Sequence, residues 1–275
     1  MKKILFFTLL SISIACFGQD SLFTDSVQTV EIDSIHSSAF SNAQVGDVTK
    51  AEGDSAYIKN NYALSTLIYE HLLKNGESAE VYYNLGNSYY KIGEIAKAVL
   101  NYERALLLQP GNSDIRANLE IARAKTVDKV EATPEIFFVS WTKALINSRS
   151  VDAWAAWGIA SFILLIIALY FFIFSKEILW KKTGFISGIV FLIITICSNL
   201  FASELKERLV NRDDAIVMNP SVTVRSTPSE GGTSLFILHE GRKVSIKDNS
   251  MKEWKEIRLE DGKVGWVPTN AIEVI

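Results

Sequence analysis

Apolar positions along the chain fall into distinct patterns, and each pattern predicts a different kind of element. The first apolar run, Ile4–Ala15, follows two lysines and is too short to cross about 30 Å of hydrocarbon, which takes about 20 residues. A basic start, a short apolar run and small residues after it are typical of a secretory signal. We therefore expect residues 1–18 to be a signal peptide cut after Gly18, with lipidation at Cys16 or an uncleaved anchor as alternatives.

Two longer apolar runs, Trp154–Phe174 and Gly184–Ala202, predict a pair of transmembrane helices. Neither run contains a charged residue, and a lysine at mid-membrane costs about 2.5–3.5 kcal/mol, so the lysines between the runs mark helix ends. We expect transmembrane helices over 153–174 and 184–203, joined by a cytoplasmic loop over 175–183. Gly184 and Gly188 are either a close-contact pair between these helices or ordinary glycines near a helix end.

The predicted signal determines the expected topology. It exports the segment that follows it, and two spans return the C-terminus to the same side of the membrane. Both soluble regions should therefore be periplasmic, and the protein should lie in the inner membrane. Just before the hairpin, residues 131–152 predict a helix with Thr133 as N-cap and Pro134 in its first turn. Its aromatic residues favour a helix lying on the membrane surface, and a packed connector is the alternative.

The first soluble region is repetitive. Residues 19–45 are polar with little periodicity and predict a flexible linker, whereas residues 46–130 show helical spacing. Five aligned positions recur after 33 residues: Gly53, Ser55, Tyr57, Tyr69 and Glu70 recur as Gly86, Ser88, Tyr90, Tyr102 and Glu103. A period of this length is typical of stacked helix pairs. Glycine inside a helix costs about 1 kcal/mol relative to alanine, so Gly86 predicts a close helix crossing.

Residues 79–112 resemble the tetratricopeptide repeat. The matching positions are Tyr82, Leu85, Gly86, Tyr89, Ala98, Tyr102, Ala105 and Pro110. The resemblance implies an all-α tetratricopeptide solenoid, here with two repeats and a capping helix. It also implies a peptide groove lined by Tyr83, Asn84, Asn87 and Asn118. Asparagine amides can hold an extended peptide's backbone because they both donate and accept hydrogen bonds, while solvated surface asparagines are the alternative.

The last region, residues 213–275, changes to short β-rich runs separated by glycine turns. It resembles bacterial SH3-type domains through Val224-Arg225-Ser226, Gly241, Trp254 and Gly265-Trp266-Val267. The resemblance implies a small, closed, all-β SH3-like barrel. Trp254 and Trp266 are then either candidate groove residues or packing residues. Together the parts predict a multidomain membrane protein.

Composition argues against several function classes. The formal net charge is -3 and no long basic run is present, so nucleic acid is not an expected partner. His36, His71 and His239 are scattered without ligand spacing, so we expect no metal. Known catalytic motifs are absent, so we expect no cofactor and no enzymatic activity. Cys16 and Cys197 both fall in apolar segments, which leaves no disulfide for the soluble regions.

The order of these parts resembles the BatE family of the Bacteroides aerotolerance operon. Membership would imply a non-enzymatic envelope protein that works with von Willebrand A-type membrane proteins and a MoxR-type ATPase in oxidative or envelope stress. The leading expectation is therefore a membrane-anchored periplasmic adaptor. The alternative is a cell-wall sensor or tether that binds peptidoglycan through the SH3-type domain.

Overall fold

The computed structural model describes residues 48–129 and 136–275, and all of these belong to one unit of the chain. The predicted signal peptide over 1–18, with Cys16, and the predicted linker over 19–45 lie outside the described residues. Thr133 and Pro134, which were expected to begin a helix, also lie outside them.

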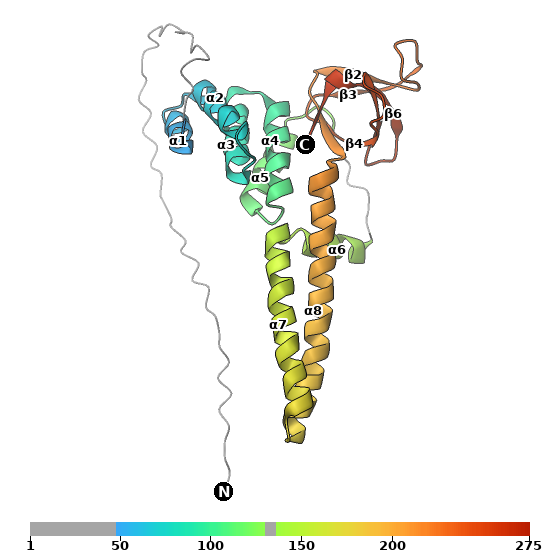
Figure 1. Ribbon diagram of the computed structural model, residues 1–275. Coiled ribbons are helices and arrows are strands. Elements are labelled where there is room, and N and C mark those ends of the chain that lie inside the picture. The colour runs from blue at the N-terminus through green and yellow to red at the C-terminus, as the bar shows by residue number, and fades with distance from the viewer. Residues whose placement is uncertain (1–47, 130–135) are drawn as a thin grey trace. The chain divides into compact units, whose positions relative to one another are not determined.

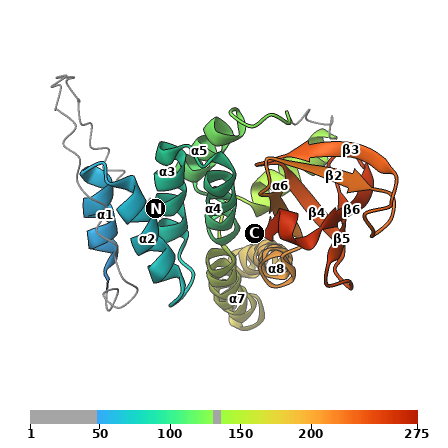
Figure 2. The same cartoon turned by 90° about the horizontal axis from the view of Figure 1, so that it is seen from above.

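Five helices form the predicted helical array (Figure 1). They are α1 (Lys50–Ile58), α2 (Tyr62–Leu73), α3 (Ala79–Ile92), α4 (Ile95–Leu108) and α5 (Ser113–Arg123). Successive helices pack against one another, and Figure 2 shows α1 to α4 side by side. The buried face of α3 carries Tyr82, Leu85 and Tyr89, which recur at helical spacing and pack with Ala98 and Ala105 of α4. The sequence prediction of stacked helix pairs is confirmed.

Gly86 has the role that its position predicted. A Cβ atom there would lie 2.7 and 2.8 Å from two ring carbons of Tyr102, which is buried on α4. One repeat earlier, a Cβ at Gly53 would lie 2.5 Å from a ring carbon of Tyr69 on α2. The glycine and the tyrosine that recur every 33 residues are thus the two sides of one repeated close crossing.

Three further helices follow the array, α6 (Phe137–Ile146), α7 (Val151–Phe174) and α8 (Ile178–Asn211). By length and composition α7 and α8 can cross a membrane, and only 17% and 11% of their most apolar windows are buried. They pack against each other as a hairpin, in which the hydroxyls of Ser161 and Thr195 lie 2.8 Å apart. α6 buries none of its side chains, and its end is tied to α7 because Trp154 Nε1 donates to the Ile146 carbonyl at 3.0 Å.

α8 is longer than the predicted span over 184–203. It begins at Ile178, inside the predicted loop over 175–183, because lysines in its first turns can extend to the interface without ending the helix. It also continues from Glu204 to Asn211 as a polar helix with Leu205 buried, and this extension contacts α4. A helix with an apolar middle and a polar end need not stop where the hydrocarbon does.

The C-terminal region is an antiparallel sheet of seven strands in the order β3-β2-β6-β5-β4-β1-β7. The strands are β1 (Asp214–Val217), β2 (Ser221–Arg225), β3 (Ser234–His239), β4 (Lys243–Asp248), β5 (Trp254–Arg258), β6 (Val264–Pro268) and β7 (Ile272–Val274), with a 3₁₀ turn, Thr269–Ala271, before β7. Alternate side chains, including Val217, Val224, Ile257 and Val267, are fully buried and form its core. The strand content that the sequence predicted is confirmed.

The predicted closed barrel is wrong, because the sheet is open. The strands at its two ends, β3 and β7, do not pair with each other. β7 instead ends against α4, where Arg104 Nη2 donates to the Val274 carbonyl at 2.6 Å and pairs with Glu273 at 3.0 Å. A sheet edge needs either a partner strand or a cover, and here a helix side chain supplies part of the cover.

Candidate functional site

The four residues predicted to line a peptide groove lie on two helices of the array. Tyr83, Asn84 and Asn87 are on α3, Asn118 is on α5, and all four are half-buried. Asn118 Nδ2 donates to Tyr83 Oη at 3.0 Å and to Asn87 Oδ1 at 2.9 Å. The structure therefore brings three of them together, while Asn84, one turn before Asn87, points to α1 and bonds Asp54.

The bonds around these asparagines form the same triad twice. In the second copy, Tyr102 Oη donates to Asn87 Oδ1 at 2.8 Å, and Asn118 donates to the same oxygen. The first copy is built on Asp54 Oδ1, which accepts from Tyr69 Oη at 2.6 Å and from Asn84 Nδ2 at 3.1 Å. We name the two copies the amide triads.

Asp54 and the two tyrosine donors were not predicted as site residues. A signal for them existed, since Asp54 precedes Asn87 by 33 residues and Tyr69 precedes Tyr102 by the same distance. Reading the repeat as a set of contacts, and not only as an apolar pattern, would have found them.

The amide triads determine which groups are left to bind a partner. The Asn87 oxygen already accepts two hydrogen bonds, and Asn118 Nδ2 already donates two. Within the described part of the chain, the amide nitrogen of Asn87 and the amide oxygens of Asn84 and Asn118 have no hydrogen-bond partner. Free N–H groups on Asn87 and Asn84 and two amide oxygens therefore remain, which suits the alternating C=O and N–H groups of an extended peptide.

At neutral pH the Asp54 carboxyl in the first triad is ionised, and the tyrosine hydroxyls in both triads are protonated. Burial disfavours the charged form of Asp54, but Lys50 at 2.7 Å and Tyr69 outweigh it and hold the pKa of the carboxyl below its ordinary value. Burial, and for Tyr69 also the Asp54 carboxylate, raises the pKa of the Tyr69 and Tyr102 hydroxyls well above their ordinary value. The carboxylate thus stays an acceptor and both hydroxyls stay donors.

Aromatic rings surround the second triad. The rings of Tyr83 and Tyr102 have centroids 6.0 Å apart, and Lys125 Nζ lies 4.1 Å from the centre of the Tyr90 ring. Ring faces and a lysine next to free amide groups give this side of α3 and α5 both apolar and polar contact area.

Trp254 and Trp266, the candidate SH3-type groove residues, lie on neighbouring strands β5 and β6. Trp254 is opposite Pro268 and Trp266 is opposite Glu256, so both tryptophans occupy the same face of the sheet. They are half-buried, whereas the alternate residues Ile257 and Val267 are fully buried. Both indoles therefore lie on the outward face, away from the core residues between them.

Metal-ligating side chains do not gather anywhere in residues 48–129 and 136–275, since no group of three or more His, Cys, Asp or Glu there could hold an ion. His71 lies on α2, and His239, on β3, bonds Asp128 with Nδ1 at 2.8 Å from Oδ1. His36 lies outside the described residues.

Comparison with known proteins agrees with the helical geometry. Residues 79–112 match the tetratricopeptide repeat family, over α3, α4 and the turn that leads to α5. A search of curated proteins found no match to the chain. The chain thus contains a tetratricopeptide repeat, and this class of repeat suggests a role in protein–protein interaction.

Proposed function

We propose that the protein is a non-enzymatic, membrane-anchored adaptor that binds a partner through the face of α3 and α5. The observation that carries the proposal is the second amide triad, which orients Asn87 and Asn118 and leaves their remaining amide groups without partners in the described chain. A fixed donor and a fixed acceptor lose little side-chain entropy on binding, so they favour capture of an extended peptide.

The way the sheet attaches to the array supports this assignment. Ile216 of β1 and Ile275 belong to the apolar core of the helices, and Lys243 of β4 pairs with Glu103 of α4 at 3.1 Å. The sheet therefore packs on α4, whereas the amide groups available for a partner are on α3 and α5.

The proposal places α7 and α8 across the inner membrane, with the array and the sheet in the periplasm and the turn at Ser175–Glu177 in the cytoplasm. The apolar side chains of both helices are largely exposed, as expected for helices that contact lipid. α6 exposes Phe137, Phe138 and Trp141, which favours a position on the membrane surface over a packed connector.

The resemblance to the BatE family suggests the partners. They are von Willebrand A-type membrane proteins and a MoxR-type ATPase system, in a complex for tolerance of oxidative or envelope stress. The repeat over 79–112, the paired helices and the terminal sheet support this proposal together.

A cell-wall tether is the second candidate. It is favoured by the common outward face of Trp254 and Trp266, because exposed indole surface can stack on sugar rings. On this alternative, the full-length protein would be retained on purified peptidoglycan.

Replacing Asn84 and Asn87 with alanine should abolish partner capture without unfolding the array. The double variant removes the free N–H groups of both asparagines and one free acceptor, and it leaves the buried Tyr102 hydroxyl without its acceptor. One unpaired hydroxyl costs about 1–3 kcal/mol of stability, which should not unfold the array. Loss of the hydrogen bonds from two asparagines to the bound peptide should weaken binding at least about tenfold. Affinity purification from membranes measures capture, and circular dichroism measures folding.

Asn249 and Asn270 in the sheet region provide a matched control, since both are exposed and their double alanine variant makes the same chemical change. Capture should be unchanged in this control. Unchanged capture in the Asn84 and Asn87 variant would contradict binding through the amide triads, and peptidoglycan retention would then favour the tether.

A further inference from the structure

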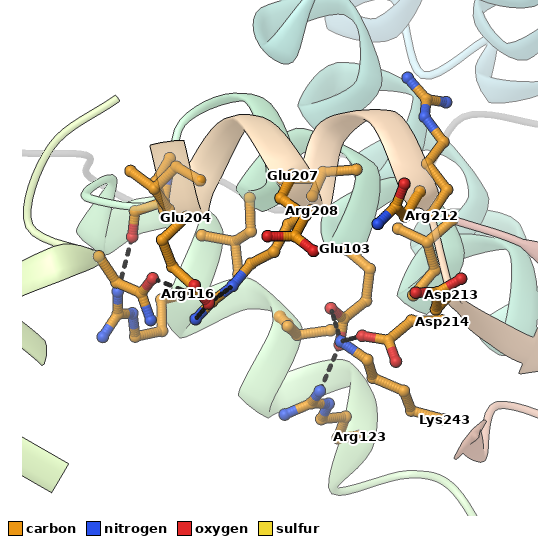
Figure 3. A pocket seen from close by; sticks show the side chains of 18 of the residues that line it. Glu103, Arg116, Arg123, Glu204, Glu207, Arg208, Arg212, Asp213, Asp214 and Lys243 are labelled. Carbon is orange, nitrogen blue, oxygen red and sulfur yellow. Dashed lines mark hydrogen bonds and ion pairs between the residues drawn. The ribbon is translucent and has the colours of Figure 1, made fainter. Parts of the chain in front are cut away.

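A cavity of about 640 Å³ lies where the helical array, α8 and the sheet meet, and we name it the junction cavity (Figure 3). Its walls come from α4, α5, the polar end of α8, and the beginnings of β1 and β4. Side chains of both charges line it together with leucines such as the buried Leu205. Its volume falls within the range of ligand pockets, about 300–1,000 Å³.

The cavity begins just above the apolar part of the hairpin. Trp154 of α7 and Phe201 of α8 pack edge to face with centroids 5.0 Å apart, as expected for interfacial aromatics. Glu204, the first α8 residue that lines the cavity, is three residues beyond Phe201, or about 4.5 Å along the helix. Since the headgroup zone of a bilayer adds about 5–8 Å on each side, Glu204 lies at headgroup depth. Glu207, six residues or about 9 Å beyond Phe201, lies at the outer edge of that zone.

The wall of the cavity formed by α5 lies at a similar depth, close to the start of α7. The array turn at Gly111 touches the linker between α6 and α7, because a Cβ on Gly111 would lie 2.3 Å from the Ser148 carbonyl oxygen. Arg116 donates to the carbonyl of Pro110, in the same turn, at 2.7 Å. Its guanidinium therefore sits near the start of α7, which is the end of that helix that carries Trp154.

Most charged groups of the junction cavity already have partners. Arg208 binds Glu204 at 3.0 Å and Asn147 at 3.2 Å, and Lys243 binds both Glu103 and Asp214. Arg116, however, has no carboxylate partner within the described residues, and Glu207 has neither a hydrogen bond nor an ion pair there. Asp213 also has no side-chain partner in that part of the chain, but it lies beyond the end of α8, past the headgroup zone. From the headgroup zone to its outer edge, the groups without an ion-pair partner are thus one cation, Arg116, and one anion, Glu207.

We propose that the junction cavity binds the headgroup of phosphatidylethanolamine. Its phosphate would pair with Arg116, and its primary ammonium would donate to Glu207, while the leucines contact the glycerol end of the lipid. Phosphatidylglycerol offers no cation for Glu207. Phosphatidylcholine has a quaternary ammonium without N–H donors, so it forms no hydrogen bond with the carboxylate. The inference rests on the proposed placement of α7 and α8 in a bilayer.

The test uses the full-length protein in nanodiscs of phosphatidylcholine with added phosphatidylethanolamine or phosphatidylglycerol. Native mass spectrometry after extraction measures which lipids stay bound. The wild type should retain phosphatidylethanolamine preferentially, and Arg116→Gln with Glu207→Gln should reduce this preference about tenfold through loss of two charge-assisted hydrogen bonds. Arg258→Gln with Glu260→Gln, at exposed positions of the sheet region, is the matched control and should change nothing.

Three results would overturn the proposal. Equal retention of phosphatidylglycerol and phosphatidylethanolamine would indicate a site that recognises only the phosphate. Absence of any lipid preference in the wild type would show that the cavity does not bind phosphatidylethanolamine. Displacement of the lipid by soluble phosphoethanolamine at equal affinity would indicate a soluble ligand. Failure to enter nanodiscs would count against the membrane placement itself, so the two proposals fail in distinguishable ways.

Discussion

Replacing Glu103 with alanine should loosen the sheet from the helical array and lower the free energy of unfolding by about 1–3 kcal/mol, the range for hydrogen bonds to charged groups. The Glu103 side chain is only 8% exposed and lies between two cations, Arg123 of α5 and Lys243 of β4. Burial disfavours the Lys243 ammonium, but Glu103 and Asp214 outweigh it and raise the lysine pKa above its ordinary value. Without Glu103, Lys243 keeps only Asp214 and Arg123 keeps only Glu120, so the ion pairs that join α4 to β4 and to α5 are lost.

Two optical signals follow this change in the full-length protein in detergent. All six tryptophans lie outside residues 46–130, so their fluorescence reports the sheet and helices α6 to α8, whereas far-ultraviolet circular dichroism reports mostly helix. We expect the denaturant transitions seen by the two signals to separate in Glu103→Ala.

Glu120→Ala is the control, because Glu120 pairs with the same Arg123 at 3.1 Å but its side chain is 63% exposed. Exposed pairs contribute at most about 1 kcal/mol, so this variant should differ little from wild type. If both variants lose the same small amount of stability, the buried pair does not hold the junction together.

The face of α3 and α5 that is proposed to bind a partner could be predicted because its information is local and repeated. Helical spacing places Asn84 and Asn87 on a common side of one helix, and the repeat places Asn118 next to Asn87. The same repeat predicted a close helix crossing at Gly86, and the structure adds that the ring of Tyr102 occupies that crossing.

The junction could not be predicted, because its contacts join distant parts of the chain. Glu103 and Lys243 are 140 positions apart, and although Glu103 recurs within the repeat, nothing in the repeat pairs it with Lys243. The prediction of a closed barrel was wrong for a related reason. The alternation of apolar residues predicts strands, but whether β3 and β7 meet depends on what else covers β7, and Arg104 of α4 does so. The apolar pattern of a sequence therefore predicts helices and strands better than it predicts which of them pack against each other.

Replacing Gly184 with alanine should destabilise the hairpin of α7 and α8 by about 2 kcal/mol. The sequence left open whether Gly184 and Gly188 form a contact pair, and the structure separates them. A Cβ on Gly184 would lie 2.7 Å from the Ala168 carbonyl oxygen and 2.8 Å from the Phe172 nitrogen, both backbone atoms of α7. Because backbone cannot rotate away as a side chain can, the two helices would have to move apart.

Gly188→Ala is the matched control within the same helix. A Cβ there would meet only side-chain carbons of Ala168 and Leu165, at 3.8 and 3.9 Å, which is ordinary contact. Alanine is also favoured over glycine in a helix by about 1 kcal/mol, so this variant should be neutral or slightly stabilising. Unfolding in increasing sodium dodecyl sulfate, followed by Trp154 fluorescence, measures both variants, since Trp154 packs on Phe201 only while the hairpin is closed. Equal stability of the two variants would show that backbone contact at Gly184 does not hold the helices together.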